Sequence, residues 1–220
     1  MDFSTITWDF SGMEIEQESF RRIDAEAPSE ARARFSAEQW HVARRLVHTG
    51  ADFAILDLLE FTHDAITAGL RALNAGAMLY SDSNMIKSGI SVPKLQKINP
   101  AYSRESILCP VADAAVADYA AEHHITRALA AVTMHKDKLD GAIFLCGNAP
   151  LALAGVVRLC VEKNIRPALI IAMPVGFVNV VESKKLLDEI DVPWIRLNGR
   201  RGGSPMAVAA LHGIMENILA

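Results

Sequence analysis

The stretch Ala142-Ile143-Phe144-Leu145-Cys146-Gly147-Asn148-Ala149-Pro150 joins an uninterrupted apolar run to a glycine-asparagine turn and a proline. A short apolar run that ends in a turn is typical of a strand buried on both faces of a sheet. Proline fits the first turn of a helix, where its missing N–H costs no hydrogen bond. The stretch therefore predicts a buried strand leading directly into a helix, the repeating unit of a parallel α/β sheet.

The same alternation extends from this stretch in both directions. Apolar runs of strand length occur at 53–59, 77–80, 107–111, 142–146, 168–173 and 194–197. Helical patterns follow them, ending near residue 73 or spanning 112–121, 126–135, 150–161, 182–190 and 205–219. Two further helices are expected at 13–27 and 36–47, the second with Ser36 and Gln39 at capping-box spacing. The sequence predicts a single domain over residues 1–220, with helices on both faces of a mainly parallel sheet and an N-terminal helical extension.

Composition restricts the class of protein. Hydrophobic residues make up 51% of the chain and charged residues 22%, as in an ordinary globular protein. The net charge of −4 argues against binding nucleic acid through bulk charge. The N-terminus lacks the basic and apolar run of a signal peptide, and the apolar stretch 168–175 is shorter than the ~20 residues that span a bilayer. We therefore expect a cytoplasmic protein that binds neither nucleic acid nor membrane.

Several familiar chemistries lack their motifs. The three cysteines, Cys109, Cys146 and Cys160, are too few and too irregularly spaced for a disulfide framework or a zinc site. The sequence has no H-E-x-x-H or G-x-S-x-G motif, no P-loop and no dinucleotide-binding fingerprint. We expect no protein-bound metal and no cofactor.

Three successive strand-to-helix junctions share one character: they contain glycines and precede a helix. They lie at 147–150, at 174–184 and at 198–205. In an open α/β sheet, ligands bind beyond the carboxyl ends of the strands, where such junctions gather. Glycine allows close backbone approach, helix N-termini attract anions, and Arg200 and Arg201 add guanidinium groups suited to carboxylate or phosphate. The junctions predict a rim that binds a small acidic molecule, although each glycine could instead only make a tight turn.

His48 stands where the second helix is expected to end. A helix C-terminus favours the charged form of histidine, so His48 could act in catalysis or merely cap the helix. The residues taken one by one specify no reaction.

Taken together, the segments resemble one family, the precorrin-8X methylmutases, also called precorrin isomerases or cobalt-precorrin-8 methylmutases. Segments in the first half of the chain that carry the resemblance are Ile15-Glu16-Gln17-Glu18-Ser19-Phe20, His48-Thr49-Gly50-Ala51-Asp52-Phe53 and Asp82-Ser83-Asn84-Met85-Ile86-Lys87-Ser88-Gly89-Ile90. Those in the second half are Thr126-Arg127-Ala128, Gly147-Asn148-Ala149-Pro150, Pro174-Val175-Gly176-Phe177-Val178, Glu182-Ser183-Lys184 and Gly199-Arg200-Arg201-Gly202-Gly203-Ser204.

The resemblance implies an isomerase of cobalamin biosynthesis that moves a methyl group from C-11 to C-12 of a corrinoid. It also implies a flavodoxin-like, three-layer fold and a homodimer with active sites near the subunit interface. The family's catalytic histidine falls on His48, which would supply a proton or hydrogen bond to the macrocycle. The arginine pair departs from the family pattern, because only Arg200 matches a firm position and Arg201 could face solvent.

Residues expected to contact the substrate are Ser19, Asp82, Asn84, Lys87, Ser88, Gly89, Ser91, Arg127, Gly147, Asn148, Gly176, Phe177, Glu182, Ser183, Lys184, Gly199, Arg200, Gly202, Gly203 and Ser204. Two alternatives remain open at this point: a non-catalytic carrier of a corrinoid intermediate, and an α/β enzyme acting on a sugar phosphate.

Overall fold

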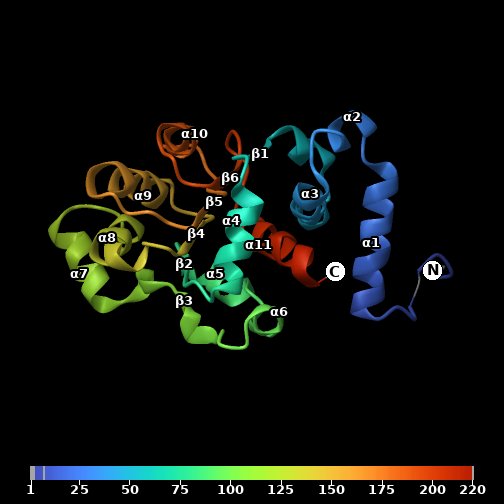
Figure 1. The fold of residues 1–220 in the computed structure, drawn as a ribbon, viewed down its shortest axis with the longest axis horizontal. Coiled ribbons are helices and arrows are strands. Elements are labelled where there is room, and N and C mark those ends of the chain that lie inside the picture. Colours follow the sequence, from blue (N-terminus) through green and yellow to red (C-terminus); the bar gives the residue numbers. More distant parts are fainter. Residues whose placement is uncertain (1–2, 7, 220) are drawn as a thin grey trace.

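A six-stranded sheet forms the centre of the computed structural model, which describes residues 3–6 and 8–219 (Figure 1). Its strands are β1 (Leu59–Phe61), β2 (Leu79–Ser81), β3 (Ile107–Leu108), β4 (Ile143–Cys146), β5 (Leu169–Ala172) and β6 (Trp194–Leu197). Their spatial order is β1-β6-β5-β4-β2-β3. The five strands from β2 to β6 pair in parallel, whereas β1 runs antiparallel to β6 at one edge.

Helices occupy most of the remaining described chain. The α-helices are α1 (Gly12–Glu26), α2 (Ser29–Arg32), α3 (Ala37–Gly50), α4 (Ala65–Asn74), α5 (Asn84–Gly89), α6 (Val92–Ile98), α7 (Ala114–Glu122), α8 (Arg127–Met134), α9 (Pro150–Lys163), α10 (Val180–Lys185) and α11 (Ser204–Leu219). Short 3-10 helices are η1 (Phe53–Asp57), η2 (Arg104–Ser106), η3 (Pro110–Ala112), η4 (Lys136–Lys138) and η5 (Leu186–Glu189). Within residues 3–6 and 8–219, no helix combines the length and the apolar content that a bilayer crossing requires.

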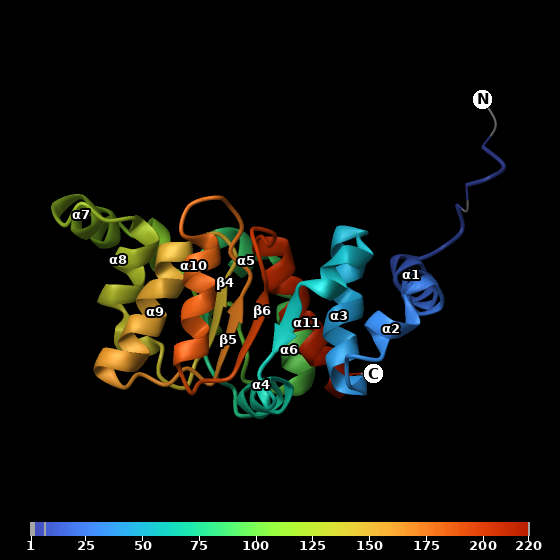
Figure 2. The ribbon, with the colours of Figure 1, turned by 90° about the horizontal axis from the view of Figure 1, so that it is seen from above.

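One hydrophobic core lies on each face of the sheet. Successive strand residues point to opposite faces, so Ile143 and Leu145 of β4 join one core while Phe144 and Cys146 join the other. Figure 2 shows α8, α9 and α10 on one side of the sheet and α3, α5, α6 and α11 on the other. The uninterrupted apolar runs seen in the sequence follow from this burial on both faces.

The strands predicted at 142–146, 168–173 and 194–197 are confirmed, as is the capping box of Ser36 and Gln39 at the start of α3. The strand predicted at 53–59 is wrong. Most of that run forms η1, which begins because the Asp52 side chain accepts a hydrogen bond from the backbone N–H of Ala54 at 2.8 Å. An apolar run of this length does not distinguish a strand from a short helix buried on one side.

Helices α3 and α11 pack against each other at unusually close range. A Cβ atom on Gly213 of α11 would lie 2.5 Å from the Cα of Val42 on α3, so only glycine allows this approach. Helix α1 lies outside α3 (Figures 1 and 2), and none of its residues 12–26 is fully buried. Helix α3, which carries His48 near its C-terminal end, therefore lies between a tightly packed α11 and a loosely attached α1.

Candidate active site

The three glycine-containing junctions meet at the carboxyl edge of the sheet. The backbone N–H of Gly176 donates to the carbonyl of Arg200 at 3.2 Å, and the N–H of Gly203 donates to the carbonyl of Met173 at 2.7 Å. Gly147 lies so close to Ser204 that a Cβ on it would fall 2.6 Å from the Ser204 Cα. The prediction that these segments gather is confirmed, but several of their backbone donors already bind acceptors within the chain.

Asp82 occupies the amides of the first junction. Its Oδ2 accepts hydrogen bonds from the backbone N–H groups of Gly147 at 3.1 Å, Asn148 at 2.7 Å and Ala149 at 2.7 Å. The Asp82 side chain is buried, and α9 begins immediately after Ala149. A carboxylate is favoured there because helix N-termini carry partial positive charge. The amides expected to meet an acidic ligand are therefore already bound to Asp82.

Lys184 joins the second junction to the third. Its Nζ donates to the carbonyls of Gly199 and Arg201, each at 2.9 Å, and its side chain is buried. Burial lowers the pKa of Lys184 to about 8. Neighbouring Ser183 is also buried and donates to the carbonyl of Val180 at 3.0 Å. Both residues were expected to contact the substrate; in this structure Lys184 binds the third junction and Ser183 binds the first turn of its own helix, α10 (Val180–Lys185).

Other predicted residues remain accessible on this edge. The guanidinium carbon of Arg200 lies 5.2 Å from the centre of the Phe177 ring, and the Phe177 side chain is 82% exposed. Arg201 forms an ion pair with Asp52, just beyond the end of α3. Exposed or half-buried residues of the predicted set are Asn84, Lys87, Ser88, Gly89, Ser91, Asn148, Gly176, Glu182, Gly199, Arg200 and Gly202. Gly203 and Ser204 are buried, and the Ser204 hydroxyl lies 2.9 Å from that of Ser83.

His48 lines a cavity of about 310 Å³ between α1 and α3. Residues that form its wall are Ser19, Arg22, Ile23, Glu26, Val47, His48, Ala51 and Phe53. The Phe20 ring meets the His48 ring edge-on, with 5.2 Å between centroids. Among the residues that the structure describes, none forms a hydrogen bond with the buried Nδ1 of His48. Within the described part of the chain, this nitrogen of His48 thus has no hydrogen-bond partner.

The charge state of His48 follows from its surroundings. Burial lowers the pKa of His48 below its usual 6.5, and the Arg45 guanidinium lowers it further. The carboxylates of Glu16 and Glu216 act in the opposite direction without reversing the shift. The neutral imidazole therefore predominates at pH 7, and the protonated form is a stronger acid than ordinary histidine.

Only some of the predicted residues lie together in one chain. Ser19 lines the His48 cavity, with its hydroxyl donating to the carbonyl of Ile15 at 2.7 Å. Arg127 is the exposed first residue of α8, and α8 and α1 lie at opposite ends of the molecule (Figures 1 and 2). Ser19 and Arg127 of the same chain therefore do not converge on one small ligand.

Sequence reasoning missed a second cavity, of about 360 Å³, between α3, α5 and α11. Its wall consists of Arg45, Thr49, Met85, Gly89, Pro205, Val208, Ala209 and His212. Gly89 is the predicted site residue among them, and Thr49 directly follows His48. His212 accepts a hydrogen bond at Nε2 from the Ser91 N–H at 3.2 Å, and burial lowers the pKa of His212 to about 4. Arg45 precedes His48 by about one turn of α3, and this spacing was the feature of the sequence that could have pointed to Arg45.

The chain matches known proteins over nearly its whole length. The family model for precorrin-8X methylmutase matches residues 14–217. A cobalt-precorrin-8 methylmutase from Methanocaldococcus jannaschii is 38% identical, with 82% of this chain and 80% of that protein covered. A precorrin-8X methylmutase from Pseudomonas aeruginosa is 36% identical, with 92% and 94% covered.

A solved structure gives the same result. A precorrin-8X methylmutase from Thermus thermophilus is 42% identical and superposes with a TM-score of 0.81, covering 93% of this chain and 95% of that one. The family model, the relatives and the solved structure all indicate the same family. The chain belongs to the precorrin-8X methylmutase family.

Proposed function

We propose that this protein is the isomerase that moves a methyl group from C-11 to C-12 of precorrin-8X or cobalt-precorrin-8, giving hydrogenobyrinate or cobyrinate, with His48 as its catalytic residue. Family membership supports the reaction. The observation that carries the role of His48 is its ring, which lines a cavity with Ser19 and keeps Nδ1 without a hydrogen bond to the described residues.

The reaction is internal to the macrocycle: one C–CH3 bond breaks at C-11 and one forms at C-12. It consumes no electrons and needs no covalent intermediate with the protein. His48 donates a proton or hydrogen bond to the ring nitrogen or C-11 region and favours the reactive tautomer. A substrate rich in carboxylates raises the pKa of His48 on binding, because a nearby negative charge favours imidazolium. Substrate binding therefore favours the protonated form of His48, which is the acid that the reaction uses.

The substrate-contacting residues divide into two groups. Accessible side chains at the carboxyl edge, such as Asn84, Asn148, Phe177 and Arg200, contact the macrocycle and its carboxylates. Buried residues such as Asp82 and Lys184 act indirectly, because their polar atoms hold the loops in place. The ring of Phe177, stacked with Arg200, offers an apolar surface beside a cation.

We further propose a homodimer in which the active site is shared. Ser19 on α1 and Arg127 on α8 lie at opposite ends of the folded molecule. Both reach one substrate only if a second copy supplies one of them. Large apolar side chains near the N-terminus are exposed and offer a surface for that copy. They are Phe3, Ile6, Trp8, Phe10, Met13 and Ile15.

We also infer a flavodoxin-like, three-layer fold and a single domain. The five parallel strands follow the order β3-β2-β4-β5-β6, which corresponds to 2-1-3-4-5 in flavodoxin-like sheets. Helix α1 is an N-terminal extension because it lies outside α3, away from the sheet. Residues 1, 2, 7 and 220 of the proposed domain lie outside the described residues.

Replacement of His48 tests the reaction. The His48→Ala variant keeps its circular dichroism spectrum and corrinoid affinity but loses most turnover, which is followed as the change in corrinoid absorption. Substrate is supplied in large excess, with and without cobalt, because the relatives carry both names. Turnover of the variant at the wild-type rate refutes the role of His48. If the wild-type protein binds one equivalent of corrinoid without turnover, it is a carrier. If it binds inorganic phosphate and not the corrinoid, it is neither the isomerase nor the carrier.

A further inference from the structure

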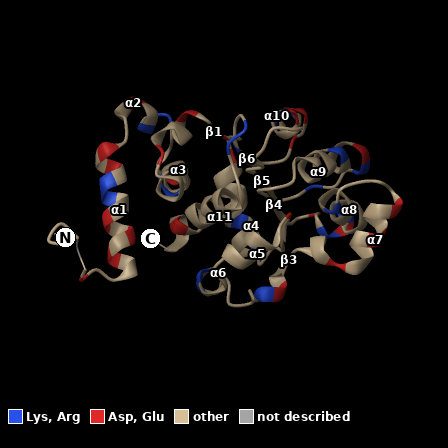
Figure 3. Ribbon diagram, turned by 180° about the vertical axis from the view of Figure 1, so that it is seen from behind, with Lys and Arg blue, Asp and Glu red and all other residues tan. Residues whose placement is uncertain are grey.

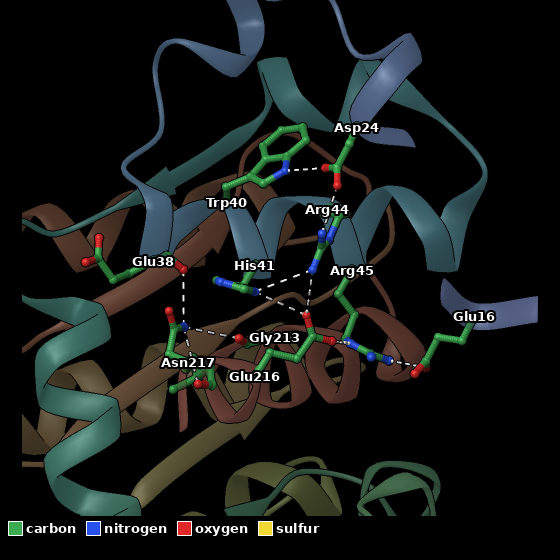
Figure 4. Close-up of polar contacts among 11 residues, drawn as sticks. Glu16, Asp24, Glu38, Trp40, His41, Arg44, Arg45, Gly213, Glu216 and Asn217 are labelled. Atoms are coloured by element: carbon green, nitrogen blue, oxygen red, sulfur yellow. Dashed lines mark hydrogen bonds and ion pairs between the residues drawn. The ribbon is translucent and has the colours of Figure 1, made fainter. Parts of the chain in front are cut away.

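A continuous chain of ion pairs and hydrogen bonds connects α1, α3 and α11 (Figure 4). Arg45 of α3 is bound on two sides: its Nη1 donates to Glu16 of α1 at 3.0 Å, and its Nε donates to Glu216 of α11. Arg44 extends the chain to Asp24 of α1 at 2.9 Å. The Arg45 side chain is only 10% exposed, so its charge is buried and paired with carboxylates from two other helices.

The same arginine touches the ring that contacts His48. The Arg45 guanidinium carbon lies 5.0 Å from the centre of the Phe20 ring, and the Arg44 carbon lies 4.4 Å from it. Phe20 in turn meets the His48 ring edge-on at 5.2 Å. Phe20 and Glu16 both belong to α1, which has no fully buried residue among 12–26. These contacts hold that part of α1 beside the catalytic histidine.

We infer that Arg45 is a positioning residue for His48: by binding Glu16 and stacking on Phe20, it fixes α1 over the end of α3 and so fixes the His48 ring. The inference rests on the proposed catalytic role of His48. Arg45 itself does not contact the substrate in this scheme. It acts through Phe20, which sets the ring orientation, and through charge, which sets how readily His48 accepts a proton.

Charges from three helices surround His48. They are Arg44 and Arg45 on α3, Glu16, Arg22 and Glu26 on α1, and Glu216 on α11. Both signs occur along α1 in Figure 3. Burial and then Arg45 lower the pKa of His48, whereas Glu16 raises it. Arg45 and Glu16 are therefore bound to each other yet have opposite effects on the same imidazole.

These opposite effects allow a test without substrate. The His48 resonances of the full-length protein are assigned by their loss in His48→Ala, and the imidazole is titrated by NMR in each variant. Arg45→Met raises the His48 pKa, because a nearby positive charge is lost. Glu16→Gln lowers it, because the amide oxygen still accepts from Arg45 while the negative charge is gone. Glu122→Gln, at an exposed position of α7 far from α1 (Figure 2), leaves the titration unchanged.

Turnover measurements separate the effect of Arg45 on the position of the His48 ring from the effect of its charge. Arg45→Lys keeps the charge but loses the planar stack on Phe20, so the His48 titration stays close to wild type while kcat falls by about 10- to 100-fold at similar KM. Arg45→Met and Glu16→Gln shifting the His48 pKa in the same direction would show that both merely loosen α1, and would overturn the inference. A wild-type titration in Arg45→Met, or a wild-type kcat in Arg45→Lys, would also overturn it. Because the titrations need no substrate, they remain interpretable if His48→Ala proves active.

Discussion

The Oδ2 atom of Asp82 lies 2.7 Å from the backbone nitrogen of Asn148, and this contact joins the segments that follow β2 and β4. Strand order reverses at this point, since β3 lies on one side of β2 and β4 on the other. Open α/β sheets usually bind ligands in the crevice at such a point, with helix N-termini receiving anions. Here the anion is a side chain of the protein itself. We therefore expect the acidic substrate to bind farther out, on the accessible residues of the edge and near α3.

Asp82→Asn tests this structural role. The asparagine oxygen still accepts from the amides of residues 147–149, but the hydrogen bonds lose their charge assistance and a buried NH2 replaces Oδ1. Oδ1 is buried and forms no hydrogen bond with the described residues, so the new NH2 enters a site without an established partner. The free energy of unfolding falls by about 2–3 kcal/mol, measured by urea denaturation. Exposed Asp118→Asn is the control. An unchanged stability together with altered corrinoid affinity would instead indicate direct substrate contact.

Mixed dimers test the shared site. His48→Ala and Arg127→Ala are each expected to be nearly inactive as homodimers. Co-expression with two affinity tags isolates dimers that contain one chain of each. If His48 and Arg127 of different chains serve one substrate, the mixed dimer has one intact site and recovers about half the wild-type rate. Activity no higher than the mean of the two parents would place both residues of each site in one chain.

The central strands of this fold were predictable because they depend on local patterns. The runs at 142–146 and 168–173 are apolar on both faces and are bounded by glycine or proline, which determines strand and turn together; the run at 194–197 follows Pro193 and is apolar except for Arg196. The run at 53–59 failed because Asp52 caps a 3-10 helix there, and the antiparallel edge strand β1 follows it. Strand pairing at an edge depends on β6, which lies more than a hundred residues away.

The sequence predicted which segments gather at the carboxyl edge of the sheet, but not which contacts their residues make there. Motifs identified Asp82 and Lys184, but residue type alone does not reveal that their charges are buried against backbone groups of distant loops. Nor does a sequence motif reveal that α1, with Ser19, and α8, with Arg127, lie at opposite ends of the folded molecule. Arg45 was missed because its importance comes from Glu16, Phe20 and Glu216, which only the packing of α1 and α11 on α3 brings together.

Because Lys184 is buried, we predict that the free energy of unfolding depends on pH in the alkaline range. Burial lowers its pKa from 10.5 to about 8, so between these values the unfolded chain binds a proton that the folded chain does not. Stability relative to Lys184→Met therefore rises with pH across this window, by about 3 kcal/mol in total. Urea denaturation at pH 7.5 to 10.5 measures the difference. Exposed Lys185→Met is the control and should parallel wild type; a parallel curve for Lys184→Met would contradict the prediction.

Because His212 is largely enclosed, we predict that protonating it in acid lowers the free energy of unfolding. Its Nε2 accepts the Ser91 N–H at 3.2 Å, and burial lowers its pKa from 6.5 to about 4. Because its folded pKa lies below the unfolded value, the unfolded chain binds the extra proton between pH 6.5 and 4. His212 therefore removes about 3 kcal/mol of stability as pH falls through this window.

The His212→Gln variant separates this effect from the protonation of carboxylates. Glutamine offers a carbonyl oxygen to Ser91 but does not titrate, so the variant should lose less stability than wild type between pH 6.5 and 4. His63→Gln, at an exposed position, is the control and should follow the wild-type curve. Urea denaturation at half-unit pH steps gives all three curves. If His212→Gln and wild type decline in parallel, His212 is not the group whose protonation destabilises the fold.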